Sequence, residues 1–139
     1  MTKIEEYEYN LPSDKEITQA IKENNIEILK DLCIPLGKQH ENWRFAQDIC
    51  VKLSDHENEG IRASALLGLS MTVMRNLKIE KNIIKPVLLR GLKDESEEVR
   101  NAAKTTIQDI NSWMKWNIGQ AQRNKSNEKR YQERKSKKS

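Results

Sequence analysis

Two stretches of the chain repeat one pattern of residues, and this repeat limits what the chain can fold into. Residues 50–69 read CVKLSDHENEGIRASALLGL and residues 88–107 read LLRGLKDESEEVRNAAKTTI. The matched positions are Leu53 with Leu92, Asp55 with Asp94, Ile61 with Val99, Arg62 with Arg100 and Ala65 with Ala103; they lie 39 residues apart before the acidic turn and 38 after it. A period near 38 residues is typical of stacked helix pairs, because one pair cannot bury its apolar face alone.

Apolar residues recur at spacings of three and four along the chain, and no run alternates as a strand would. Ser13 and Glu16 form a capping box at the start of the first predicted helix. A second helix is predicted from Ile26, ending or kinking at Pro35 and Gly37. Four further helices are predicted over 42–53, 61–76, 81–93 and 97–118, and the one over 61–76 is apolar on almost every side. Six helices joined by turns predict an all-α fold.

The second unit resembles the HEAT repeat in the run PVLLRGLKDESEEVRNAA, residues 86–103. The resemblance covers about residues 43–117, although the first unit has Gln47 where the proline would stand and one extra residue in its turn. It implies a short α-solenoid of about two HEAT-like helix pairs plus an N-terminal helix pair over 13–37, in which Glu27 occupies the place of the arginine. It also implies that the repeated charged side chains hydrogen-bond turns across neighbouring units. These structural repeat positions are Asp55, Arg62, Asp94 and Arg100.

Charge divides the chain into parts of opposite sign. Residues 1–60 carry 7 basic and 13 acidic side chains, a net of −6, whereas residues 115–139 carry 9 basic and 2 acidic side chains, a net of +7. The predicted organisation is a loose lead-in over 1–12, a HEAT-like helical domain over 13–118 and a basic tail over 119–139 that is disordered or an extended helix. An acidic front and a basic tail favour different partners.

The sequence contains no pattern typical of a catalytic, cofactor or metal site. Phosphate-binding glycine loops and a GxSxG motif are absent. Cys33 and Cys50 form no CxxC pair and are expected to be reduced, half-buried thiols. His40 and His56 each begin an identical His-Glu-Asn triplet, whose Glu and Asn suit a helix start better than a metal site. We therefore expect a protein that is not an enzyme and, since no apolar run approaches 20 residues, one that is soluble and cytoplasmic.

A helical repeat without catalytic groups presents a binding surface, so we expect a protein partner. Small stand-alone HEAT-like proteins resemble some bacterial immunity proteins, including those paired with contact-dependent growth-inhibition toxins. The acidic front half suits a basic, nuclease-type toxin, which the protein would neutralise by binding and occluding it. The expected partner-binding residues are Glu41, Trp43, Asp48, Glu57, Glu59 and Trp116. The alternatives are an accessory scaffold subunit, or a small nucleic-acid-binding protein that uses the tail over 119–139.

Overall fold

A computed structural model describes residues 10–119, and over this range the chain forms seven helices and no strand. The helices are α1 Asp14–Glu23, α2 Ile26–Leu29, α3 Cys33–Gln39, α4 Trp43–Leu53, α5 Glu59–Asn76, α6 Lys81–Gly91 and α7 Glu97–Met114. The all-α prediction is thereby confirmed for the described part of the chain. The predicted lead-in over 1–12 and basic tail over 119–139 lie outside the described residues, apart from residues 10–12 and 119.

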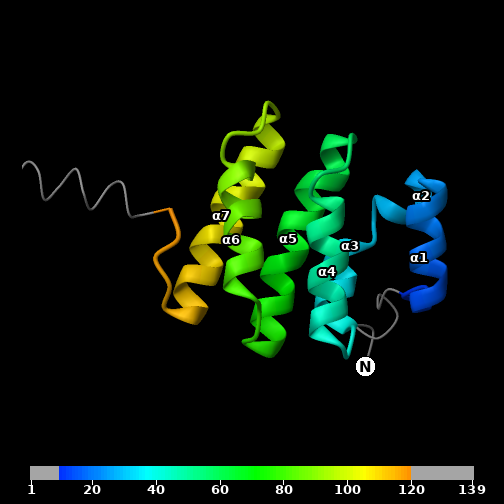
Figure 1. Cartoon of the computed structure of the whole chain (residues 1–139), viewed down its shortest axis with the longest axis horizontal. Coiled ribbons are helices and arrows are strands. Elements are labelled where there is room, and N and C mark those ends of the chain that lie inside the picture. The colour runs from blue at the N-terminus through cyan, green and yellow to red at the C-terminus, as the bar shows by residue number, and fades with distance from the viewer. Residues whose placement is uncertain (1–9, 120–139) are drawn as a thin grey trace, which may run out of the picture.

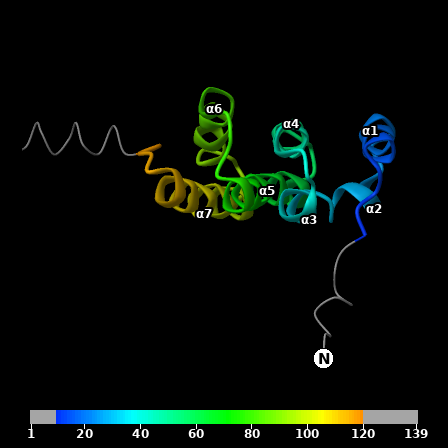
Figure 2. The same cartoon turned by 90° about the horizontal axis from the view of Figure 1, so that it is seen from below.

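The helices lie in two rows. Figure 2 shows α1, α4 and α6 in one row and α2, α3, α5 and α7 in the other. The long helix α5 is central, since it packs against α3, α4 and α7. Helices α4 to α7 alternate in direction, so their connections gather at two opposite edges (Figure 1). The α4–α5 and α6–α7 turns, residues 54–58 and 92–96, form what we call the turn edge.

Side-chain caps begin α1, α4, α5 and α7, and the sequence predicts helix starts at three of them, Ser13, Asn42 and Asn58. The Ser13–Glu16 capping box is present, with Glu16 N–H donating to Ser13 Oγ at 3.1 Å and Ser13 N–H donating to Glu16 Oε1 at 3.0 Å. Asn42 accepts two backbone N–H bonds at the start of α4, and Asn58 and Ser96 each accept one at the starts of α5 and α7. These bonds satisfy amide groups that have no partner inside the helix, which fixes where each helix starts.

The second predicted helix is two helices, and neither Pro35 nor Gly37 ends one of them. A turn over residues 30–32 separates α2 from α3, and Pro35 lies in the first turn of α3. A proline costs no hydrogen bond there, because the first N–H groups of a helix have no intrahelical acceptor. Gly37 lies inside α3 against Gly68 of α5, where the two backbones touch. Gly37 is therefore a position of close packing.

Helix α7 ends at Met114, earlier than the predicted end near Ile118. Lys115 adopts a left-handed conformation with φ of 58° and ends the helix. The chain then folds back, since the side-chain amide of Asn111 donates to the Ile118 carbonyl at 3.0 Å and accepts from its N–H at 2.9 Å. Ile118 is 2% exposed, so this return segment, residues 115–119, packs against α7.

The core is aliphatic and includes both cysteines. Helix α5 is buried on nearly all sides, as the sequence predicts. Cys33 and Cys50 are free and fully buried, where the sequence predicted half-buried thiols. The hydrogen bond between these two residues and their burial raise the pKa of the Cys50 thiol. No helix of the described residues has the length and apolar character that a membrane crossing requires.

Candidate interaction surface

Arg62 joins the two turns of the turn edge. Its Nη1 donates to the carbonyl oxygens of His56 at 2.9 Å and Glu57 at 3.0 Å, both in the turn that precedes α5. Its Nε and Nη2 donate to the two carboxylate oxygens of Asp94, at 3.0 and 2.9 Å, in the turn that precedes α7. The Arg62 and Asp94 side chains are only 13% and 16% exposed. A bidentate pair in this setting fixes the relative position of the two turns.

Arg100 repeats half of the Arg62 arrangement. Its Nη1 donates to the carbonyl oxygens of Asp94 at 2.7 Å and Glu95 at 3.0 Å, in the turn that precedes its own helix. Within residues 10–119, no carboxylate accepts a hydrogen bond from its Nε or Nη2. Asp55, expected to bond a neighbouring unit, makes no side-chain hydrogen bond within the same residues. Three of the four repeat positions therefore act in this set of contacts, and Asp55 does not.

His56 takes the role that the sequence assigned to Asp55. Its Nδ1 accepts from the backbone N–H of Asn58 at 2.9 Å, as Asp94 Oδ1 accepts from Ser96 at the same distance. The first unit has one more turn residue than the second, and this shifts the equivalent position from residue 55 to residue 56.

The two His-Glu-Asn triplets have one structural function. In each, the histidine Nδ1 accepts from the backbone N–H of the asparagine that caps the next helix, at 2.9 Å. The Nε2 of His40 lies 2.7 Å from Asp14 Oδ1 at the start of α1, and the Nε2 of His56 lies 2.5 Å from Asn24 Oδ1 at its end. The histidines therefore hold α1 at both ends. They lie at opposite ends of α4, so the two cannot share one metal ion.

The Arg62–Asp94 pair predicts a dependence of stability on pH. The Arg62 guanidinium holds the pKa of the Asp94 carboxyl below its ordinary value, and the Ser96 N–H lowers it further. Because the folded-state pKa is the lower one, this stabilisation is fully present above the unfolded pKa of about 3.9 and is lost as pH falls through the folded pKa. At pH 6, Asp94→Asn should lower the free energy of unfolding by about 1 kcal/mol, the gain that an ionised acceptor gives over a neutral one.

Urea unfolding at pH 6 and pH 3 checks this prediction. The difference between the wild type and Asp94→Asn should be smaller at pH 3, because below the unfolded pKa of about 3.9 the unfolded wild-type chain is stabilised by binding a proton at Asp94. Asp55→Asn is the matched control, an exposed aspartate in the neighbouring turn, and should change stability little at either pH. A deficit of Asp94→Asn that is the same at both pH values would contradict the proposed role of the carboxylate charge.

A second set of contacts joins two tryptophans at the opposite edge. The Arg44 guanidinium lies 4.9 Å from the ring centre of Trp43, and Arg44 Nε lies 3.3 Å from Glu80 Oε1. The ammonium of Lys81, the next residue, lies 5.1 Å from the ring centre of Trp116. We call these five residues the tryptophan edge. The contacts bring together the starts of α4 and α6 and the return segment that follows α7 (Figure 1).

The buried side chain of Gln47 holds the tryptophan edge from beneath. Its Nε2 donates to Glu80 Oε1 at 2.8 Å, and its Oε1 accepts from the Glu80 N–H at 2.7 Å. Gln47 is fully buried, which is unusual for a glutamine, so this pair of bonds accounts for a polar residue in the core. Glu80 is thereby fixed between Arg44 and α6.

Within residues 10–119, the three most exposed large apolar side chains lie where α5 ends and α6 begins, on the side of the molecule that holds the tryptophan edge. Met74 in the last turn of α5 is 47% exposed, Leu77 after that helix is 57% exposed, and Ile83 in the first turn of α6 is 41% exposed. Trp43 and Trp116 are each half-buried. Exposed apolar and aromatic side chains that lie close together are typical of protein interaction surfaces.

The structure separates the six expected partner-binding residues into groups. Trp43 and Trp116 belong to the tryptophan edge, and the exposed Glu41 lies two residues before Trp43. Asp48 is exposed on α4, and its Oδ1 accepts from Gln47 Nε2 at 3.1 Å.

Glu57 and Glu59 lie at the other end of α4, on or next to the turn edge. The sequence reading missed Arg44, Glu80 and Lys81 as part of the surface. Their opposite charges are visible in the sequence, but 36 residues separate Arg44 from Glu80, and only the antiparallel course of the helices brings them together.

Comparison of the chain with protein-family models, with curated proteins and with solved structures finds no match. The function proposed below therefore depends on the chain's own residues and geometry.

Proposed function

We propose that the protein is a non-catalytic protein-binding module, built as a short HEAT-like α-solenoid, which neutralises a toxin by binding and covering it. The repeated contacts of Arg62 and Arg100 with the turns before their helices support the HEAT-like architecture. In such an architecture, each helix pair stacks on the next and leaves extended surfaces free for a partner.

The tryptophan edge is the observation that carries the binding role. It combines two half-buried tryptophans with the exposed apolar side chains of Met74, Leu77 and Ile83 at the same end of α5 and α6. Tryptophan and arginine are enriched among the residues that dominate binding energy at protein interfaces. The Arg44–Glu80 ion pair is largely exposed and contributes little to stability, so these residues suit contacts with a partner.

The acidic surface beside this edge supports a basic partner such as a nuclease-type toxin. Glu41 is exposed two residues before Trp43, Asp48 is exposed more than one turn further along α4, and Glu57 and Glu59 lie at the other end of that helix. Helix α4 has 11 residues, so it is about 16 Å long. A standard interface buries about 800 Å² on each partner and therefore reaches from one end of α4 to the other.

Binding kinetics against a basic, nuclease-type toxin domain, sought first among the genes next to this one, test the proposal. The double reversal Glu41→Lys with Glu57→Lys changes two exposed carboxylates at the two ends of α4. It should slow association about tenfold at low salt, because complementary charge mainly accelerates encounter, and the effect should shrink at high salt. Trp43→Ala should speed dissociation about thirtyfold, since a lost anchor of about 2 kcal/mol appears mainly in the dissociation rate.

Glu98→Lys is the matched control, because it reverses an exposed carboxylate of α7 outside the acidic front half. It should leave both rate constants within about twofold, since single rim charges have small effects. Circular dichroism of each variant should match the wild type. If the reversals and Trp43→Ala change nothing while deletion of residues 120–139 abolishes binding, the proposed surface is wrong.

A further inference from the structure

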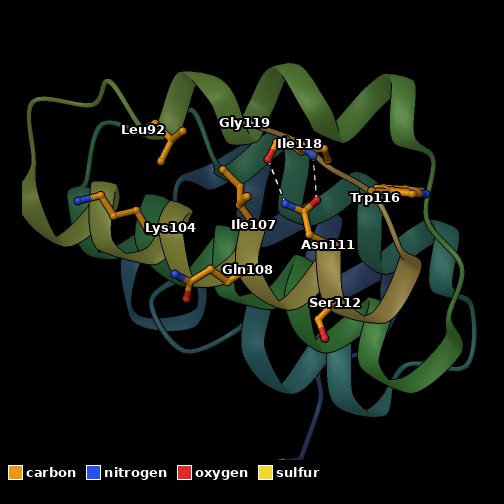
Figure 3. Close-up of a pocket in the computed structure, with 9 residues that line it drawn as sticks. All are labelled: Leu92, Lys104, Ile107, Gln108, Asn111, Ser112, Trp116, Ile118 and Gly119. Atoms are coloured by element: carbon orange, nitrogen blue, oxygen red, sulfur yellow. Dashed lines mark hydrogen bonds between the residues drawn. The ribbon is translucent and has the colours of Figure 1, made fainter. Parts of the chain in front are cut away.

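A groove of about 640 Å³ runs along α7 at the end of the molecule (Figure 3). Its α7 side chains are spaced by three, one, three and one residues, so they lie on one helical face: Lys104, Ile107, Gln108, Asn111 and Ser112. Leu92 of the α6–α7 turn and Trp116, Ile118 and Gly119 of the return segment complete the lining. The face runs over the nine residues 104–112, whose eight steps rise about 12 Å, slightly more than two helical turns.

Helix α5 of the first unit has an equivalent face, and α7 covers it. The positions 38 residues before the α7 lining include Leu66, Leu69 and Ser70, all of them buried. Thr106 Oγ1 of α7 donates to the Leu66 carbonyl at 2.9 Å, and Ser70 Oγ of α5 donates to Asp109 Oδ2 at 2.9 Å. One helix therefore already packs on this face in the first unit, and the groove on α7 is the equivalent place in the second unit.

Each of these two faces follows an arginine, and the two arginines differ in whether they bind a carboxylate. Arg62 lies one turn before Leu66 and holds the Asp94 carboxylate with Nε and Nη2. Arg100 lies one turn before Lys104, bonds two turn carbonyls as Arg62 does, and directs no bond from Nε or Nη2 to a carboxylate of the described residues. The turn before α5 is thus joined to the turn before α7 by the Arg62–Asp94 pair. At the turn before α7, the Nε and Nη2 of Arg100 bind no carboxylate of the described residues.

We propose that the α6–α7 end binds an acidic helical segment of a partner protein, whose carboxylate pairs with Arg100 as Asp94 pairs with Arg62. The partner helix lies along the groove on α7, as α7 lies along α5. Its carboxylate stands in the turn before that helix, because Asp94 stands three residues before the first residue of α7. This surface lies apart from the acidic side chains of the proposed function and has the opposite charge preference, although it shares Trp116 with the tryptophan edge.

The lining of the groove favours this occupant. It contains Lys104 and no acidic side chain, so Lys104 attracts carboxylates to the groove, as Arg100 does nearby. Lys104 and Gln108 replace the buried Leu66 and Ser70 of the first unit, which keeps the free face soluble, as the outer face of a terminal unit must be. Leu92 is half-buried and remains as an apolar contact for a partner helix, whereas Ile107 is only 8% exposed and lies beneath the return segment.

The test uses the full chain with one additional copy of residues 81–114 inserted after Gly119 through a flexible linker. This copy supplies an Asp94 carboxylate at high effective concentration, in the unit that Arg62 already binds. We expect hydrogen exchange of the Arg100 Nε–H with water, measured by NMR, to slow at least tenfold relative to the unmodified chain. The Arg62 Nε–H in the same spectrum gives the reference for a paired arginine.

The matched control carries Asp94→Asn in the added copy alone, so the original fold and Arg100 are unchanged. Arg75 serves as the internal control, since its Nη1 donates to the carbonyl oxygens of Lys38 and His40 away from the groove. Its exchange should stay the same in all chains. Equal Arg100 exchange in the Asp and Asn versions overturns the proposal.

Two other occupants give distinct results in the unmodified chain. If deletion of residues 120–139 speeds Arg100 Nε–H exchange at least tenfold, the chain's own C-terminal segment occupies the site and the partner proposal is wrong. If the exchange slows with rising protein concentration, a second copy of the chain is the occupant, which also overturns it. Exchange that is independent of both conditions supports a separate partner protein.

Discussion

Replacing Gly68 with alanine should lower the free energy of unfolding by about 3 kcal/mol or more, the upper range for added volume in a packed core. A Cβ at this position would lie 2.6 Å from the carbonyl oxygen of Cys33 and 2.7 Å from Cys50 Sγ. The first of these is backbone, so relief requires α3 and α5 to move apart. Since α5 is the central helix, this movement would also disturb its packing against α4 and α7.

Thermal unfolding followed by circular dichroism measures this effect, and a loss of about 3 kcal/mol corresponds to a fall in Tm on the order of 15 °C. Gly60→Ala is the matched control, because it changes another glycine of α5 and the nearest atom to the added Cβ is a side-chain oxygen, Asn58 Oδ1, at 3.2 Å, with no backbone atom in the way. This change should be neutral or stabilising by up to about 1 kcal/mol, since alanine favours the helix. Equal stability of the two variants would contradict the close packing of α3 on α5.

Local signals in the sequence predicted the helices well. The capping residues Ser13, Asn42 and Asn58 sit where helices begin, and the run after Gly60 that is apolar on almost every side is the buried central helix. These features depend on residues within a few positions of each other, so they are visible without a structure.

Features that depend on packing between helices were not predicted. Gly37 looks like a helix stop in the sequence, yet it allows α3 to touch α5. Pro35 looks like a breaker, yet it fits the first turn of α3 at no cost in hydrogen bonds. In both cases the residue type is consistent with two roles, and the neighbouring helix decides between them.

The candidate surface was predicted in part, for the same reason. The sequence predicts Trp43 and Trp116 as partner-binding residues, but their connection through Arg44, Glu80 and Lys81 requires the antiparallel arrangement of α4 to α7. The acidic residues were grouped by charge along the sequence, whereas the structure distributes them between the two ends of α4. Charge in a sequence indicates the kind of partner, and only the fold shows which charges one partner can contact together.

Arg62→Ala should destabilise the protein by about 3 kcal/mol, comparable to the loss on breaking a largely buried ion pair. The change removes both bonds to the Asp94 carboxylate, which is 16% exposed, and both bonds to the turn carbonyls of His56 and Glu57. The carboxylate then remains in a poorly solvated place without its cation. Arg44→Ala is the matched control, since the Arg44–Glu80 pair is 61% and 36% exposed, and it should cost less than about 1 kcal/mol.

A double-mutant cycle with Asp94→Ala separates the ion pair from the carbonyl bonds. If the pair joins the two units, the single changes should not add, and the coupling between Arg62 and Asp94 should be about 2 kcal/mol in urea unfolding at pH 7. In the Asp94→Ala background, Arg62→Ala can remove only the bonds to the turn carbonyls, so the remaining loss of stability measures those bonds. Arg100 makes the same kind of bonds in its own turn. Arg100→Ala should therefore lose roughly that remaining part, about 1–2 kcal/mol, because it has carbonyl bonds but no carboxylate partner among the described residues. A coupling below about 0.5 kcal/mol would show that each turn is held by its own arginine alone, and that the two units are joined by apolar packing between α5 and α7.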